Sequence, residues 1–210
     1  MATRSKPLLA LLSVLLLVAG GCGRGGNGAP GPAEPQGGEE EDQGPPAADF
    51  QLGDVRLIDS ADRPESPSVA DSRIPKVVEL VNNYYNNAFL DPGKWGDGAH
   101  PELANLFTEE AKPNVAPRIG ILALGDVSRA LTEVTPDKQQ IDRLTLYFDT
   151  DINQPLGAVT TSFEATATPT DEGGGPVKIV HTGTFWLQPE GDGFRISAFD
   201  ANINIGQGAA

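Results

Sequence analysis

The chain contains 210 residues, with 15 Lys and Arg against 29 Asp and Glu, which gives a formal net charge of −14. A surface of this sign repels nucleic-acid phosphates and anionic lipid headgroups, so the composition opposes nucleic-acid binding and electrostatic attachment to a membrane. The single cysteine cannot form an intramolecular disulfide, so the folded part must depend on its core.

The N-terminus predicts where the protein works. Two basic residues precede a nearly continuous apolar run over residues 8–18, and small residues then lead to Cys22. The run is about eleven residues long, whereas a membrane-spanning helix needs about twenty. Residues 1–21 therefore predict a cleavable secretory signal and not a permanent transmembrane helix.

The residues that end at Cys22 resemble the lipobox of bacterial lipoproteins, with Ala19 in place of the usual Leu. The resemblance implies that the thiol of Cys22 receives a diacylglyceryl group and becomes the first residue of the mature chain. Two acyl chains are enough for stable anchoring. We therefore expect a lipid-anchored protein at the extracytoplasmic face of the cell membrane. An ordinary secreted chain with an incidental cysteine is the alternative.

Residues 22–72 predict a disordered tether. They are rich in Gly, Pro, Ala and acidic residues, so they bury too little apolar surface to offset the entropy of ordering. A flexible chain of this length spans on the order of 40 Å. A short apolar interruption at 50–58 is interpreted as plain linker by default, with a strand or a docking segment as the alternatives.

The folded domain is predicted over residues 73–210, which is a common size for a single domain. Apolar residues three and four positions apart over 77–89 predict a first helix, and Pro75 suits its first turn. A second helix is predicted from Pro101 to near Pro113. The apolar run at 119–124 is too short for periodicity to distinguish a helical turn from a buried strand, and we prefer the helical turn.

After residue 127 the apolar period changes to two. Short turns separate the alternating segments, which predicts an antiparallel meander that follows the helices, so the fold class is α+β. The predicted strands are 140–150, 156–168, 176–188 and 193–204, with a weaker strand at 129–134.

Both faces of these strands carry large residues. Alternation places Tyr147, Trp186 and Phe199 on the face opposite the Leu- and Phe-rich one. A face that only contacts water would be polar. The three aromatic residues are therefore interface candidates, to be covered by a curl of the sheet, a partner subunit or a ligand.

The first helix closed by Phe89-Leu90-Asp91, the short second helix and the last strand over 191–200 together resemble the NTF2-like (SnoaL-like, cystatin-like α+β) superfamily. The chain has Phe194 where many members have a Trp. The resemblance implies a cone-shaped pocket between the first helix and the sheet, and dimerisation through the other sheet face. Enzymatic members place an Asp, His or Tyr in that pocket for proton transfer.

His181 is the candidate catalytic residue. It shares the predicted inward face of Phe185 and Leu187, so it is either a general base near neutral pH or a core histidine, and we prefer the core interpretation. Glu164 and Asp200 lie on predicted strands where either face is possible.

Tyr84, Tyr85 and Trp95 are, with His181, the candidate ligand-binding residues. The two tyrosines point about 100° apart on a helix, so only one of them could face the cone. We prefer core packing for these tyrosines, with ligand binding as the alternative. Trp95, in the loop that follows the first helix, is expected to fold back onto that helix as a lid.

Asp149, Asp151 and Asn153 match the first half of a calcium loop. Gln154 stands where the loop needs Gly, and Thr160 stands where a bidentate Glu would close the site. Turn chemistry explains these residues equally well. We therefore predict no metal site and no cofactor.

The leading hypothesis is a lipid-anchored domain that binds an envelope protein or a small apolar ligand. The first alternative is an NTF2-like isomerase, dehydratase or cyclase that uses His181. The second alternative is a homodimeric structural module.

Overall fold

The computed structural model describes residues 46–60, 64, 66–149, 154–171 and 173–207. They form one sheet and a set of helices and helical turns, so the α+β class predicted from the sequence is confirmed. The strands are β1 (Gln51–Asp59), β2 (Leu131–Phe148), β3 (Leu156–Pro169), β4 (Val177–Glu190) and β5 (Gly193–Gln207). The helices are α1 (Ser66–Tyr85), which continues as a π-helical turn (Asn86–Leu90), and the short α2 (Ile119–Leu122). Six 3-10 turns complete the described elements: Pro92–Lys94, Gly96–Gly98, Leu103–Leu106, Lys112–Asn114, Ala116–Arg118 and Gly125–Ala130.

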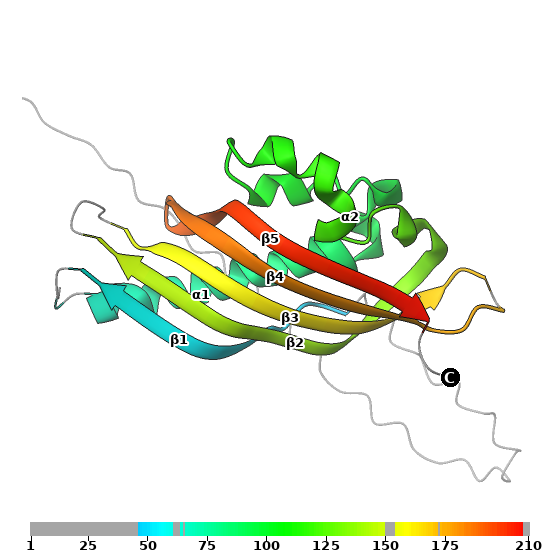
Figure 1. Ribbon diagram of the computed structural model, residues 1–210, viewed down its shortest axis with the longest axis horizontal. Helices are drawn as coiled ribbons and strands as arrows, with labels where there is room; N and C mark the ends of the chain where they lie inside the picture. The colour runs from blue at the N-terminus through cyan, green and yellow to red at the C-terminus, as the bar shows by residue number, and fades with distance from the viewer. Residues whose placement is uncertain (1–45, 61–63, 65, 150–153, 172, 208–210) are drawn as a thin grey trace, which may run out of the picture. The chain divides into compact units, whose positions relative to one another are not determined.

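The sheet has the order β1-β2-β3-β4-β5 (Figure 1). Strands β2 to β5 form the predicted antiparallel meander, and the weak strand predicted at 129–134 is the start of the long β2. Strand β1 pairs parallel to β2, so the sheet is mixed and not purely antiparallel. A parallel pair needs a long crossover, which α1 and the helical turns provide between β1 and β2.

The linker interpretation of 50–58 is wrong, because β1 covers most of this segment. Residues 48–50, just before β1, also form hydrogen bonds with the rest of the domain, and we call them the strap. The backbone N–H groups of Ala48 and Phe50 donate to the side-chain oxygens of Asn86 and Asn82, at 2.7 and 3.0 Å. The N–H of Asp49 donates to Gln139 Oε1 at 2.8 Å. Periodicity gives no signal for such a strap, because its contacts are side-chain amides distant in the sequence.

Helix α1 starts earlier than predicted, so Pro75 lies inside it and not in its first turn. Pro75 has no backbone N–H, so one hydrogen bond of the helix is not made. The buried side of the helix nevertheless extends upstream of Pro75, through Ala70 to Ser66. The second helix predicted over 101–113 is replaced by 3-10 turns. Phe107 adopts extended backbone angles and pairs with Ile196 of β5, which ends the helical segment. The helical turn preferred at 119–124 is confirmed as α2.

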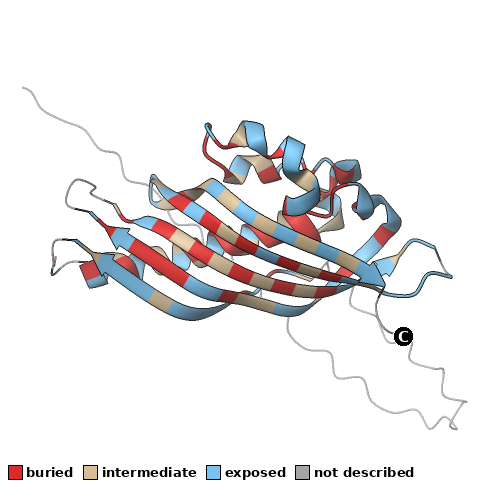
Figure 2. Cartoon of the chain, viewed as in Figure 1, coloured by how far each residue is buried: buried red, intermediate tan, exposed pale blue. Residues whose placement is uncertain are grey.

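Helix α1 and the helical turns lie on one side of the sheet, which we call the inner face (Figure 1). Buried and exposed positions alternate along the central strands, and the opposite, outer face is turned to the viewer without a described helix over it (Figure 2). Alternation therefore predicts correctly which side of the central strands is inward.

A β-bulge breaks this alternation in β5. Trp186 pairs with Ala198, but the next residue of β4, Leu187, pairs with Ile196, so Ser197 is the extra residue. One extra residue moves all later side chains of a strand to the opposite face.

The prediction that Phe199 shares the outer face is therefore wrong. Its ring packs on the inner side, 5.7 Å from the ring of Phe107, and the guanidinium of Arg118 lies 5.6 Å from its centroid. The interface candidates on the outer face are reduced to Tyr147 and Trp186.

The Phe50→Ala variant tests the strap. Phe50 is 3% exposed and its ring lies 4.2 Å from that of Tyr85, so its truncation leaves a core cavity and lowers the free energy of unfolding by about 3 kcal/mol. Urea unfolding measures the change. The control is Leu52→Ala on β1, which removes a side chain that is 39% exposed and costs under about 1 kcal/mol. Equal effects of the two variants would contradict the docked strap.

Candidate functional site

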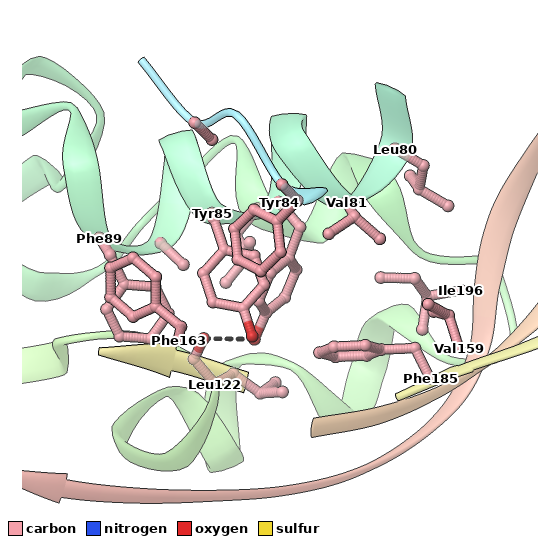
Figure 3. Packing of buried hydrophobic residues seen from close by; sticks show 14 of the residues in the cluster. Leu80, Val81, Tyr84, Tyr85, Phe89, Leu122, Val159, Phe163, Phe185 and Ile196 are labelled. Atoms are coloured by element: carbon pink, nitrogen blue, oxygen red, sulfur yellow. Dashed lines mark hydrogen bonds between the residues drawn. The ribbon is translucent and has the colours of Figure 1, made fainter. Parts of the chain in front are cut away.

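The apolar centre of the space between α1 and the sheet, where the resemblance implies a pocket, is filled, and an open polar groove of about 260 Å³ lies at its edge between α1 and the β4–β5 turn. A cavity of about 10 Å³ remains, which is barely the room that one water molecule needs. Figure 3 shows how the side chains of α1 and the sheet meet across it. The residues that line it are Leu80, Val81, Tyr84, Tyr85, Val159, Phe185, Leu187 and Ile196.

His181 lies on the inner face, as predicted, and is fully buried. Its Nδ1 is 2.8 Å from the hydroxyl of Tyr85, which is in turn 2.8 Å from the hydroxyl of Thr161. Nε2 forms no regular hydrogen bond within the described part of the chain. The ring of Phe89 packs against the imidazole at 5.0 Å. No carboxylate of the described residues hydrogen-bonds to the ring, and the geometry is that of a core histidine.

Burial lowers the pKa of His181 to about 4, because the charged imidazolium loses its hydration; the backbone carbonyl of Ile121 opposes the shift. The ring is therefore neutral at pH 7. It can accept a hydrogen bond from Tyr85, but it has no exposed atom that could take a proton from a substrate.

Both tyrosines are buried, as the preferred core interpretation predicts. Tyr84 donates to the backbone carbonyl of Leu122 at 2.5 Å (Figure 3), and Tyr85 reaches Thr161 and His181 on the sheet. Burial raises the pKa of both hydroxyls. The two hydroxyls point in different directions: α2 covers the hydroxyl of Tyr84, and the sheet covers the hydroxyl of Tyr85. Neither side chain is available to a ligand.

Trp95 is 4% exposed and belongs to the core, so the loop folds back as expected. His100 beside it is buried as well, with Nδ1 3.0 Å from the carbonyl of Asn87. Burial lowers the pKa of His100. Asp97 and His100 have positive φ angles of 55° and 46°, which the tight turns of this loop require.

The outer face carries the exposed candidates. Tyr147 and Trp186 are 42% and 43% exposed. In the sheet register Tyr147 lies between Ile58 and Leu156, and these are also exposed. We call Ile58, Tyr147, Leu156 and Trp186 the outer patch. Alternation in the sequence predicts the two aromatic residues but not Ile58, because the linker interpretation of 50–58 assigns no sheet face to Ile58.

A groove of about 380 Å³ lies on the outer face next to Trp186, and we call it the polar groove. Asp200 lines this groove and is exposed, so its side chain lies on the outer face. Glu164 lies outside the groove and pairs with Lys178 at 2.9 Å. This pair lowers the pKa of Glu164. The side chains that line the groove on the outer face are Asp142, Thr160, Ser162, Thr182, Thr184, Asp200 and Asn202.

Several predicted residues are not part of either surface. Asp149 is exposed, and Asp151 and Asn153 lie outside the described residues, as does Cys22. Among the residues that are described, no three His, Cys, Asp or Glu side chains gather in a way that could hold a metal ion. No helix in that part of the chain has the length and apolar character to cross a membrane.

Comparisons with family models, with curated proteins and with solved structures found no match for this chain. The geometry of the two surfaces is therefore what carries the functional argument.

The buried His181 predicts a pH-dependent stability. The unfolded ring takes up a proton near pH 6.5, whereas the folded ring stays neutral down to about pH 4. Protonation therefore favours the unfolded state, and stability is lost as the pH falls through this window, by about 3 kcal/mol in total. Urea unfolding at pH 7 and at pH 5 measures the fall.

The His181→Gln variant should lose this dependence between pH 7 and pH 5, while His100→Gln keeps most of it. An unchanged slope in His181→Gln would contradict the assignment.

Proposed function

We propose that the chain is a bacterial lipoprotein with an NTF2-like domain, held at the extracytoplasmic face of the membrane by a lipid on Cys22. It acts by binding a partner in the cell envelope through the outer face of its sheet. The N-terminal leader and the lipobox-like sequence support the anchor. The long helix α1 packed against a curved meander supports the NTF2-like architecture (Figure 1).

The contrast between the two sheet faces carries the functional part of the proposal. The apolar centre of the inner face has room for about one water molecule, whereas the outer face presents four large apolar side chains that are 37–48% exposed. Tyr and Trp are enriched in protein interfaces, and clustered exposed apolar residues mark binding surfaces. The outer patch therefore supports binding of a partner over capture of a small apolar ligand in the cone.

The two alternatives from the sequence have less support. An enzyme that uses His181 needs a path for the substrate to a residue that is fully buried and neutral. A homodimer through the outer patch would bring together two copies of a chain with a net charge of −14, which opposes self-association.

Site-specific photocrosslinking in the producing cells tests the proposal. A benzophenone amino acid replaces Tyr147 in the full chain, and the matched control replaces Val127, which is 39% exposed in the 3-10 turn before β2. We expect a discrete adduct at Tyr147 and none at Val127. An adduct of twice the chain mass would replace the proposal with the homodimer, and the absence of any adduct at Tyr147 would overturn it.

The Cys22→Ala variant tests the anchor. Each buried methylene of the acyl chains contributes about 0.8 kcal/mol to membrane binding, and the chain has no second cysteine to carry a lipid. We expect the wild type in the membrane fraction, labelled by an alkyne fatty acid, and the processed variant in the soluble fraction without label. Mass spectrometry of the N-terminus confirms that the leader was removed. A processed variant that stays in the membrane would contradict the anchor.

A further inference from the structure

The polar groove is built from regular rows across the three C-terminal strands. Side chains on one face of neighbouring strands lie about 4.8 Å apart, so each row presents three polar groups side by side. The first row is Thr160, Thr184 and Asp200, and the second is Ser162, Thr182 and Asn202.

Most of these groups are free to bind a ligand. Ser162 donates to Asp142 Oδ2 at 2.5 Å, and Thr160 has a long contact of 3.4 Å with the carbonyl of Arg143. The other four side chains make no hydrogen bond or ion pair within the described residues; these are Thr182, Thr184, Asp200 and Asn202. A hydroxyl can donate and accept, a carboxylate accepts, and an amide does both. The groove thus offers donors and acceptors together.

Trp186 stands at one end of the groove, two residues from Thr184 on the same face of β4. Its cross-strand neighbours are Ala158 on β3 and Ala198 on β5. Because both neighbours are small, no large side chain in register covers the indole, and it is 43% exposed. Tyr147 lies two strands away and two residues further along, at about 12 Å by the strand spacing and residue rise, and offers a second aromatic surface.

The charge of the groove selects the class of ligand. Asp142 and Asp200 line it, and no Lys or Arg does. The nearest cation in register, Arg143, is paired with Asp54 at 3.5 Å. An anionic ligand would therefore be repelled, and a purely apolar ligand would leave the free polar groups without partners.

We propose that the polar groove and Trp186 form a binding site for a neutral glycan chain. The inference rests on the proposed function, because it names the ligand class of the same outer face. A sugar ring carries C–H groups on its faces, which suit the negative face of an indole, and hydroxyls around its rim, which suit a row of hydroxyl, amide and carboxylate groups. A chain of such rings can lie along the groove with one ring on Trp186.

The two tryptophans allow a direct test in the purified chain. Trp186 is exposed and Trp95 is buried, so iodide quenches the fluorescence of Trp186 selectively. The probes are chitohexaose, cellohexaose and maltohexaose, with a heparin hexasaccharide as the anionic control. We expect at least one neutral probe to protect Trp186 from iodide saturably, and the heparin probe to give no protection.

Isothermal titration calorimetry then measures the affinity of variants for the protecting probe. Thr184→Val removes one hydroxyl and should raise the Kd about fivefold, and Trp186→Ala should raise it more than tenfold. Val127→Ala, a comparable exposed apolar truncation away from the groove, should leave the Kd unchanged.

Three outcomes would overturn the glycan site: no protection by any neutral probe, equal binding of the heparin probe, or an unchanged Kd in both groove variants. The photocrosslink at Tyr147 separates this failure from failure of the proposed function. A protein adduct there with no glycan binding would leave a partner-binding module without a glycan site. Loss of both results would remove both proposals.

Discussion

The rest of the domain depends on the hydrogen bonds that the buried hydroxyl of Tyr85 forms with the sheet. From helix α1 its hydroxyl reaches Thr161 of β3 and His181 of β4, both at 2.8 Å, so one group ties the helix to two strands. Its ring lies 4.2 Å from that of Phe50, which joins the N-terminal strap to the same cluster. A buried polar group is costly unless it is paired, so this network requires the helix, the sheet and the strap to adopt one relative position.

This constraint also explains why the two sheet faces differ in accessibility. The aromatic cluster around Tyr85, together with α2 above Tyr84, occupies the space that an open cone would need. The sheet face that remains accessible is the outer one, where Trp186 stands next to a groove with free polar groups and Tyr147 lies beyond it. The bulge at Ser197 contributes to this division, because it turns Phe199 inward. The outer surface that results is polar at its centre and aromatic at one end.

Much of the sheet could be predicted from residue patterns, and the reason is local. Alternation assigns His181 to the inner face and Tyr147 and Trp186 to the outer face, since the side-chain period of a strand is two wherever the backbone is regular. Prediction failed where one residue disturbs the period, as at Ser197, or where partners distant in the sequence hold a segment in place. The strap and β1 are of the second kind, because Asn82 and Gln139 accept the hydrogen bonds of the strap and β2 pairs with β1.

The amino-acid sequence by itself determined the α+β class, the order of the meander and the inward side of its central strands, because periodicity and short turns act over a few residues. It also carries the apolar run at 8–18 and Cys22, on which the proposed anchor rests and which are properties of the chain and not of its fold. Only the tertiary structure decided that Tyr84, Tyr85, Trp95 and His181 are packing residues, because burial depends on what other segments place beside them. It likewise assembled the polar groove, since three strands must align in register before their hydroxyl, amide and carboxylate groups can act together.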